Sequence, residues 1–217
     1  MMAAPAFLIV RSKAPASRFH AFCRANAGGA GAVFAARPVE DVCALEPGSV
    51  PLNTLIAKYG SLDEAKAAWS GMDAAALAEP EPPLVLAANA VPDEGLPPEL
   101  DFVPTHTNVE APPGQPPTLM VIEGSASDPD EMDKYRDIIL PMMRERGAYY
   151  LCFQIGGDVE VLSGTWSEGI FAISRWSDAH LARDFWLSPR YQDDAIPIRI
   201  NIGSFQVVTL EGERDDG

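Results

Sequence analysis

Histidine and cysteine, the side chains most often used in metal centres and nucleophilic catalysis, are scarce in this chain. Its 217 residues include three histidines and three cysteines, and no two cysteines are spaced as Cys-x-x-Cys. His20, His106 and His180 lack the spacing of metal ligands, and no Ser-His-Asp order accompanies them. The pattern argues against a zinc site or a disulfide framework and favours free thiols in a reducing compartment. We therefore expect no metal and no cofactor.

Basic residues are also few. Sixteen Lys and Arg stand against 31 Asp and Glu, a formal net charge of −15. Such a chain repels phosphate backbones and anionic membrane surfaces, so neither nucleic acid nor a membrane is an expected partner. No apolar run approaches the roughly 18–20 residues of a membrane span. The first ten residues have an apolar run without a basic segment before it, which favours a strand over a signal peptide. A cytoplasmic location is therefore expected.

Proline, in contrast, is concentrated in one place. Eight of the 20 prolines fall within residues 92–117, where they remove backbone donors and disfavour helix. This composition predicts an extended, semi-rigid linker. The predicted divisions are a first unit at 1–91, the linker at 92–117, a second unit at 118–212 and an acidic tail at 213–217.

The second unit predicts the order β-α-β-β-α-β. Residues 118–126 are strand-like, and Asp128-Pro129 opens a helix that ends at Gly147. Two apolar stretches flank Gly156-Gly157 and predict a hairpin. Residues 169–176 then predict a strand, 177–188 a helix and 198–210 a last strand. This order is the ferredoxin-like or split βαβ arrangement.

The first unit repeats this order in a weaker form. Lys58, Tyr59 and Trp69 match Arg175, Trp176 and Trp186 at a common spacing of 117 residues. We interpret the two units as a tandem duplication. A sheet of this kind has both helices on one face, so its other face must be covered. In the dimeric α+β barrel superfamily two such sheets pack face to face. One chain could here supply both, giving an α+β fold of two tandem ferredoxin-like units that form an intrachain pseudo-dimer.

The residues of the second unit resemble the domain-of-unknown-function family 1330. The match rests on Asp128-Pro129, Tyr135, Gly147, Gly164-x-Trp166 and the closing Trp186-x-Ser188-Pro189-x-Tyr191-Gln192. One departure concerns chemistry, because the family's Glu before the glycine is Ser163 here. The first unit lacks the Ser-Pro-x-Tyr-Gln signature and is interpreted as a degenerate copy. The resemblance implies a fold but no established reaction.

Four residues are candidates for a binding site between the two sheets: Trp166, Arg175, Trp186 and Tyr191. Arg175 and Trp176 end one strand, so one of them faces the other sheet and its neighbour faces the helices. An inward Arg175 could hold an anionic or aromatic ligand by bidentate bonds and stacking. In the alternative interpretation Arg175 pairs with an acidic group and the tryptophans fill the core.

Two hypotheses for the function follow. The first is a protein that binds a small anionic or aromatic molecule between its sheets, as a cofactor-free oxygenase or isomerase would. The second is a non-catalytic structural or regulatory protein whose barrel interior is filled by side chains. The sequence leaves open which ligand is bound and whether two chains pair again as a homodimer.

Overall fold

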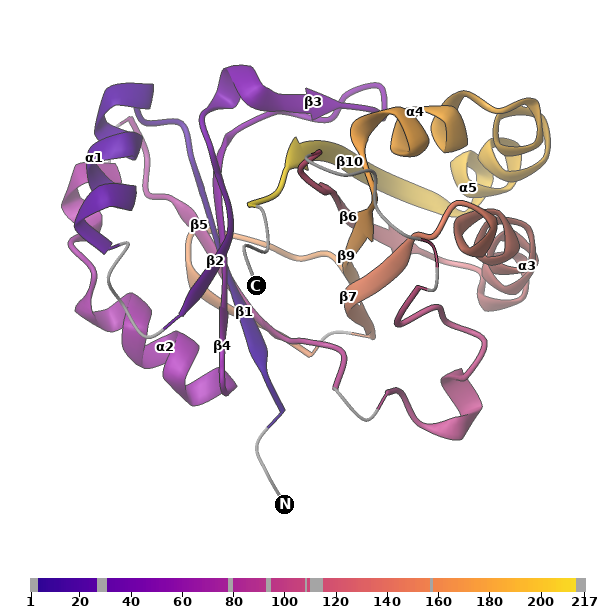
Figure 1. The fold of residues 1–217 in the computed structure, drawn as a ribbon, viewed down its shortest axis with the longest axis horizontal. Helices are drawn as coiled ribbons and strands as arrows, with labels where there is room; N and C mark the ends of the chain where they lie inside the picture. The colour runs from indigo at the N-terminus through magenta and orange to yellow at the C-terminus, as the bar shows by residue number, and fades with distance from the viewer. Residues whose placement is uncertain are drawn as a thin grey trace.

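Two antiparallel sheets pack face to face, and helices cover the outer face of each (Figure 1). This computed structural model describes residues 4–26, 31–77, 80–92, 95–107, 109, 115–156 and 158–213. Buried apolar side chains form three layers: one between the first sheet and its helices, one between the sheets, and one between the second sheet and its helices. The expected α+β fold is therefore confirmed.

Each sheet contains five strands. Sheet A has the order β2-β4-β1-β5-β8: β2 (Ala32–Arg37), β4 (Asn53–Tyr59), β1 (Ala6–Ser12), β5 (Leu84–Asn89) and β8 (Val159–Ser163). Sheet B has the order β3-β10-β6-β9-β7: β3 (Val42–Ala44), β10 (Gly203–Glu211), β6 (Thr118–Ala126), β9 (Ile170–Trp176) and β7 (Tyr149–Ile155). Four strands of each sheet have the ferredoxin-like order, and β4 and β9 lie at the predicted spacing of 117. A common origin of the two halves stays a prediction.

The central strands are apolar on both faces because both faces are covered. All seven residues of β1 are buried, as are six of the seven in β9. In β6, Leu119 and Val121 belong to the layer between the sheets, whereas Met120 belongs to the layer under the helices. The alternation of side chains along a strand thus supplies two cores from one sheet.

The predicted hairpin at Gly156-Gly157 is wrong. Strand β8 pairs with β5 of sheet A, and it leaves β7 in sheet B. In the same way β3 leaves the first half and pairs with β10. The chain passes from one sheet to the other because a strand at the edge of each sheet has unpaired backbone groups that the opposite half can satisfy. Each half therefore completes the sheet of the other.

The helices are α1 (Ala16–Asn26) and α2 (Leu62–Gly71) on sheet A, and α3 (Pro129–Glu145), α4 (Ala179–Leu187) and α5 (Ile196–Ile202) on sheet B (Figure 1). Asp128 caps α3 as predicted, since its carboxylate accepts from the N–H groups of Asp130 and Glu131. The predicted last strand at 198–210 is wrong at its start, because α5 occupies its first residues and β10 begins at Gly203.

The described part of the proline-rich linker packs against the second half. Val103 is buried in the helix-side core of sheet B, and the carbonyl of Pro104 accepts from the N–H of Tyr150 at 2.8 Å. Within the tail, Glu213 forms an ion pair with Arg37 at 2.7 Å; residues 214–217 lie outside the described residues. No helix in the described ranges has the length and apolar character that a bilayer crossing demands.

Candidate functional site

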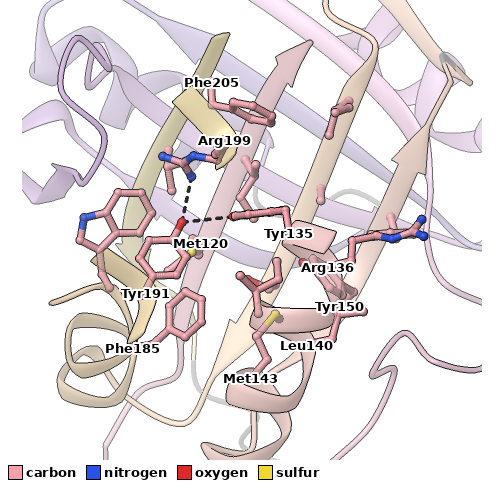
Figure 2. Close-up of a pocket in the computed structure, with 18 of the residues that line it drawn as sticks. Met120, Tyr135, Arg136, Leu140, Met143, Tyr150, Phe185, Tyr191, Arg199 and Phe205 are labelled. Carbon is pink, nitrogen blue, oxygen red and sulfur yellow. Dashed lines mark hydrogen bonds between the residues drawn. The ribbon is translucent and has the colours of Figure 1, made fainter. Parts of the chain in front are cut away.

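A cavity lies between sheet B and its helices, on the face of the sheet that points away from sheet A (Figure 2). It encloses about 60 Å³. Helix α3 lines it with one stripe of residues at helical spacing, and the strands line it with alternate residues. The stripe consists of Met132, Tyr135, Arg136, Ile139, Leu140 and Met143.

The Trp-x-Ser-Pro-x-Tyr-Gln signature builds one wall of this cavity. Helix α4 ends at Leu187, and the Ser188 hydroxyl donates to the carbonyl of Phe185 at 2.7 Å. The side-chain amide of Gln192 then donates to the carbonyl of Trp186 at 2.6 Å, which ties the next turn back to α4. The rings of Trp186 and Tyr191 consequently lie 5.0 Å apart between centroids, tilted by 42° to each other, and both line the cavity.

Three buried polar side chains form a chain of hydrogen bonds in this mainly apolar space (Figure 2). The hydroxyls of Tyr135 and Tyr191 lie 3.2 Å apart, and Nη1 of Arg199 donates to the Tyr191 hydroxyl at 2.9 Å. The three residues come from α3, from the turn after α4 and from α5. They place two hydroxyls and one cation side by side at the cavity wall.

Arg199 is 2% exposed, and its charge is balanced from the first half of the chain. Its guanidinium forms an ion pair with Glu46, which follows β3. The guanidinium carbon also lies 5.0 Å from the ring centre of Trp186 and 5.2 Å from that of Phe205. Burial lowers the pKa of Arg199 to about 10, so it stays a cation at neutral pH.

Burial has the opposite effect on the tyrosines of the cavity. It raises the pKa of Tyr135 to about 12 and also raises the pKa values of Tyr150 and Tyr191. All three hydroxyls therefore stay protonated at neutral pH and can donate hydrogen bonds. The described residues that line the cavity include no histidine and no carboxylate, so they offer donors to an oxygen atom but no imidazole or carboxylate base.

The structure separates the four candidate residues, which the sequence placed in one site between the sheets. Trp186 and Tyr191 line the helix-side cavity. Trp166 lines a different space, an open cleft between the sheets at one end of the barrel. Arg175 lies opposite Leu119 in the register of β9 and β6, on the face turned toward sheet A, and lines neither space. Trp176 takes the helix side, as the alternation of the strand requires.

The middle of the barrel is filled by side chains. Phe7, Ile9, Val121 and Phe171 are among the buried residues that meet there, each at most 2% exposed. These side chains leave no cavity at the centre of the barrel among the described residues, and a ligand site between the sheets stays a prediction. No group of His, Cys, Asp or Glu among the described residues is arranged to hold a metal ion.

The sequence analysis did not identify three residues of this site: Arg199, Tyr150 and Glu46. Arg199 was predicted to lie in the last strand, but it lies in the short helix α5, whose apolar residues resemble those of a strand. Glu46 lies in a loop of the other half, and no local pattern connects it to Arg199. Tyr135 was noted as part of the family signature, and that signature was the one signal that pointed to this cavity.

Comparisons with known proteins agree with the fold. Residues 117–213 match the family described as domain of unknown function (DUF1330), so the resemblance of the second half is confirmed. No curated protein sequence matches the chain. A Fusobacterium nucleatum protein provisionally named a monooxygenase aligns over 99% of this chain and 94% of its own, with 11% identity and a TM-score of 0.52.

Two further structures are similar in the same way. An anthrone oxidase-like protein aligns over 97% of this chain and 92% of its own, with 9% identity and a TM-score of 0.52. A chlorite dismutase from Candidatus Nitrospira defluvii aligns over 99% of this chain and 92% of its own, with 10% identity and a TM-score of 0.46. At these identities the similarity concerns the fold alone, two facing sheets that each contain four strands in the ferredoxin-like order.

Proposed function

We propose that the second half binds a small aromatic molecule carrying a hydroxyl, carbonyl or carboxylate oxygen, in the cavity between sheet B and its helices. The ring would lie among the apolar side chains, and the oxygen would accept hydrogen bonds from Arg199, Tyr191 or Tyr135. The observation that carries this proposal is the buried Tyr135–Tyr191–Arg199 chain, at 3.2 and 2.9 Å, in a lining that is otherwise largely apolar.

The charge of the site favours a neutral ligand that accepts hydrogen bonds, because Glu46 balances the charge of Arg199. Arg199 is a buried cation, and the hydroxyls beside it are held protonated. Hydrogen bonds from a charged donor such as Arg199 are about twice as strong as those between neutral groups. Burial raises the pKa of a phenol in this cavity, as it does for Tyr135 and Tyr191, so a bound phenol should stay protonated and exchange hydrogen bonds with these groups.

The cavity must widen to admit such a ligand. Ligand pockets commonly measure about 300–1,000 Å³, whereas this cavity encloses about 60 Å³. Three methionines line it, Met120, Met132 and Met143, and methionine side chains repack easily. Ile155, which is 48% exposed, and the partly exposed Met132 and Phe153 mark the side on which the cavity meets solvent. Movement of these side chains would open the cavity.

A cofactor-free oxygenase or isomerase reaction is compatible with this site under one condition. Both reactions pass through an enolate or a related oxyanion, which a preorganised cation and hydroxyl donors stabilise. Since the described residues of the lining include no histidine or carboxylate to act as a base, the ligand itself would have to be acidic enough to ionise. Binding of an oxygen-bearing aromatic ring is thus the function that we propose, with turnover restricted to ligands acidic enough to ionise in this cavity.

The competing function is a non-catalytic one, and the filled centre of the barrel favours it. The two proposals differ in what they expect of the helix-side cavity. A structural protein would keep this cavity closed against every ligand. A ligand-binding protein would respond to the oxygen of the ligand and to the residues that hold it.

The test uses 2-naphthol and naphthalene as a matched pair, with binding followed by thermal shift and by the fluorescence of naphthol. We expect 2-naphthol to stabilise the protein more than naphthalene does and, like the buried tyrosines, to ionise at a higher pH when bound than it does in water. Tyr191→Phe should remove the difference between the two compounds. Arg175→Ala should retain it, because Arg175 lies on the opposite face of the sheet. Equal responses to both compounds, or no response to either, would contradict the proposal.

A further inference from the structure

The cleft between the sheets is a second space with polar residues at its base, and it lies on the opposite face of sheet B from the cavity described above. It measures about 770 Å³, within the range of small-molecule sites, and is open to solvent. Both halves line it: Arg11 and Leu84 come from sheet A, and Glu123 and Gln206 come from sheet B. It lies at the end of the filled barrel interior.

Its base is a buried charge pair at equivalent positions of the two halves. Arg11 lies opposite Thr54 in sheet A, and Glu123 lies opposite Phe171 in sheet B. Thr54 and Phe171 are themselves the second residues of the matching strands β4 and β9. Arg11 is 4% exposed and Glu123 is 5% exposed, and their side chains form an ion pair across the gap between the sheets.

The aromatic candidate of this region is fixed in place by the same pair. Nε1 of Trp166 donates to Oε2 of Glu123 at 2.9 Å, and its ring packs edge-on against Phe171 at 6.4 Å between centroids. Trp166 is only partly buried and lines the cleft. Gln206 pairs with Glu123 in the register of β10 and β6, so its side chain belongs to the same face.

One polar atom at the base of the cleft lacks a partner. Nε of Arg11 is buried and has no hydrogen-bond acceptor within the described residues. A buried donor without an acceptor is costly, and an oxygen atom from a ligand would satisfy it. The residue that carries this donor lines the cleft.

The charges around the cleft decide what kind of oxygen fits. Both cations of the lining already have carboxylate partners, Arg11 with Glu123 and Lys13 with Glu81 at 2.7 Å. A third carboxylate, Glu168, also lines the cleft, so carboxylates outnumber cations there. An anionic ligand would therefore be repelled. The cleft can therefore bind a neutral ligand through hydrogen bonds to its paired charged groups, to Gln206 and to the hydroxyls of the lining. The ring of Trp166 lies beside these polar groups.

We propose that this cleft is a binding site for a neutral, hydroxyl-rich molecule of the size of one or two sugar rings. Ring hydroxyls match the donors and acceptors at its base, and the apolar face of a pyranose matches an indole ring. The site is separate from the helix-side cavity, because Glu123 faces sheet A whereas its neighbour Ile122 lines that cavity.

The experiment follows the indole N–H signal of Trp166 by NMR while D-glucose, D-galactose or maltose is added to the full chain. We expect at least one of these sugars to move that signal, with a dissociation constant of about millimolar order. Trp166→Phe assigns the signal. Gln206→Ala, a change at an exposed side chain, should raise the dissociation constant about three- to tenfold.

Tyr191→Phe is the matched control and should leave sugar binding unchanged, whatever it does to the helix-side cavity. Glucuronate tests the opposite assignment, because it presents the same ring with a negative charge. If glucuronate binds and the neutral sugars do not, the cleft is an anion site and the proposal fails. It also fails if none of the three sugars moves the signal at roughly 100 mM, a hundred times the expected constant, or if Gln206→Ala binds as well as the natural chain does.

Discussion

Replacing Glu46 by Gln tests the contact that ties the first half of the chain to the cavity of the second. Glu46→Gln keeps the shape of the side chain and removes the charge that faces Arg199. The guanidinium would then be a cation, 2% exposed, without its carboxylate. Removing one partner of a buried ion pair costs about 3–5 kcal/mol, because the remaining charge is left uncompensated.

Two features of the structure place the effect at the low end of that range. The side chain of Glu46 is 14% exposed, so water screens part of the interaction. Arg199 also keeps the Tyr191 hydroxyl and the rings of Trp186 and Phe205. We expect Glu46→Gln to lower the free energy of unfolding by about 3 kcal/mol, which corresponds to a fall in Tm of roughly 6–12 °C for a chain of this size.

Urea unfolding followed by circular dichroism measures this free energy, and a double-mutant cycle isolates the pair. In an Arg199→Met background the change at Glu46 should cost less than about 1 kcal/mol, because no buried charge is left behind. Glu213→Gln is the control, since its ion pair with Arg37 at 2.7 Å is far more exposed and should contribute less than about 1 kcal/mol. A loss at Glu46 that is equally large with Met at position 199 would refute the reasoning.

Two other expectations concern the stability of the fold. The pKa of Tyr135 is raised from 10 to about 12, so between these pH values the native state holds a proton that the unfolded chain has released. The contribution of Tyr135 to the free energy of unfolding is therefore complete below pH 10 and falls by roughly 3 kcal/mol as the pH rises to 12. The difference in unfolding free energy between the natural chain and Tyr135→Phe should therefore shrink over that range, and a constant difference would contradict the assignment. A Cβ atom at Gly203 would lie 1.8 Å from the carbonyl oxygen of Ser125, so Gly203→Ala should push β10 away from β6 and cost about 1–3 kcal/mol in thermal or urea unfolding. Gly71→Ala, at the end of α2 with nothing within 4 Å, should be neutral or slightly stabilising, and similar losses at both positions would speak against this account.

The sequence by itself determined most of the elements and the class of fold. Unbroken apolar stretches such as Ala6–Val10 identify strands covered on both faces, and the Asp128 cap and Gly147 bound helix α3. These signals are local, because they depend on backbone donors, on side-chain alternation and on helical spacing. The repeated spacing of 117 residues then led to two facing sheets, since each four-stranded unit leaves one face uncovered.

Only the tertiary structure decided where ligands could bind. The alternation of side chains along a strand showed that Arg175 and Trp176 point to opposite faces of the sheet. It did not show which face of the sheet borders a cavity. The exchange of β3 and β8 and the pairing of Arg199 with Glu46 join residues far apart in the chain. Such contacts leave no trace in local periodicity, because they depend on how the two halves are packed together. The same packing filled the centre of the barrel and left space under the helices and at one end.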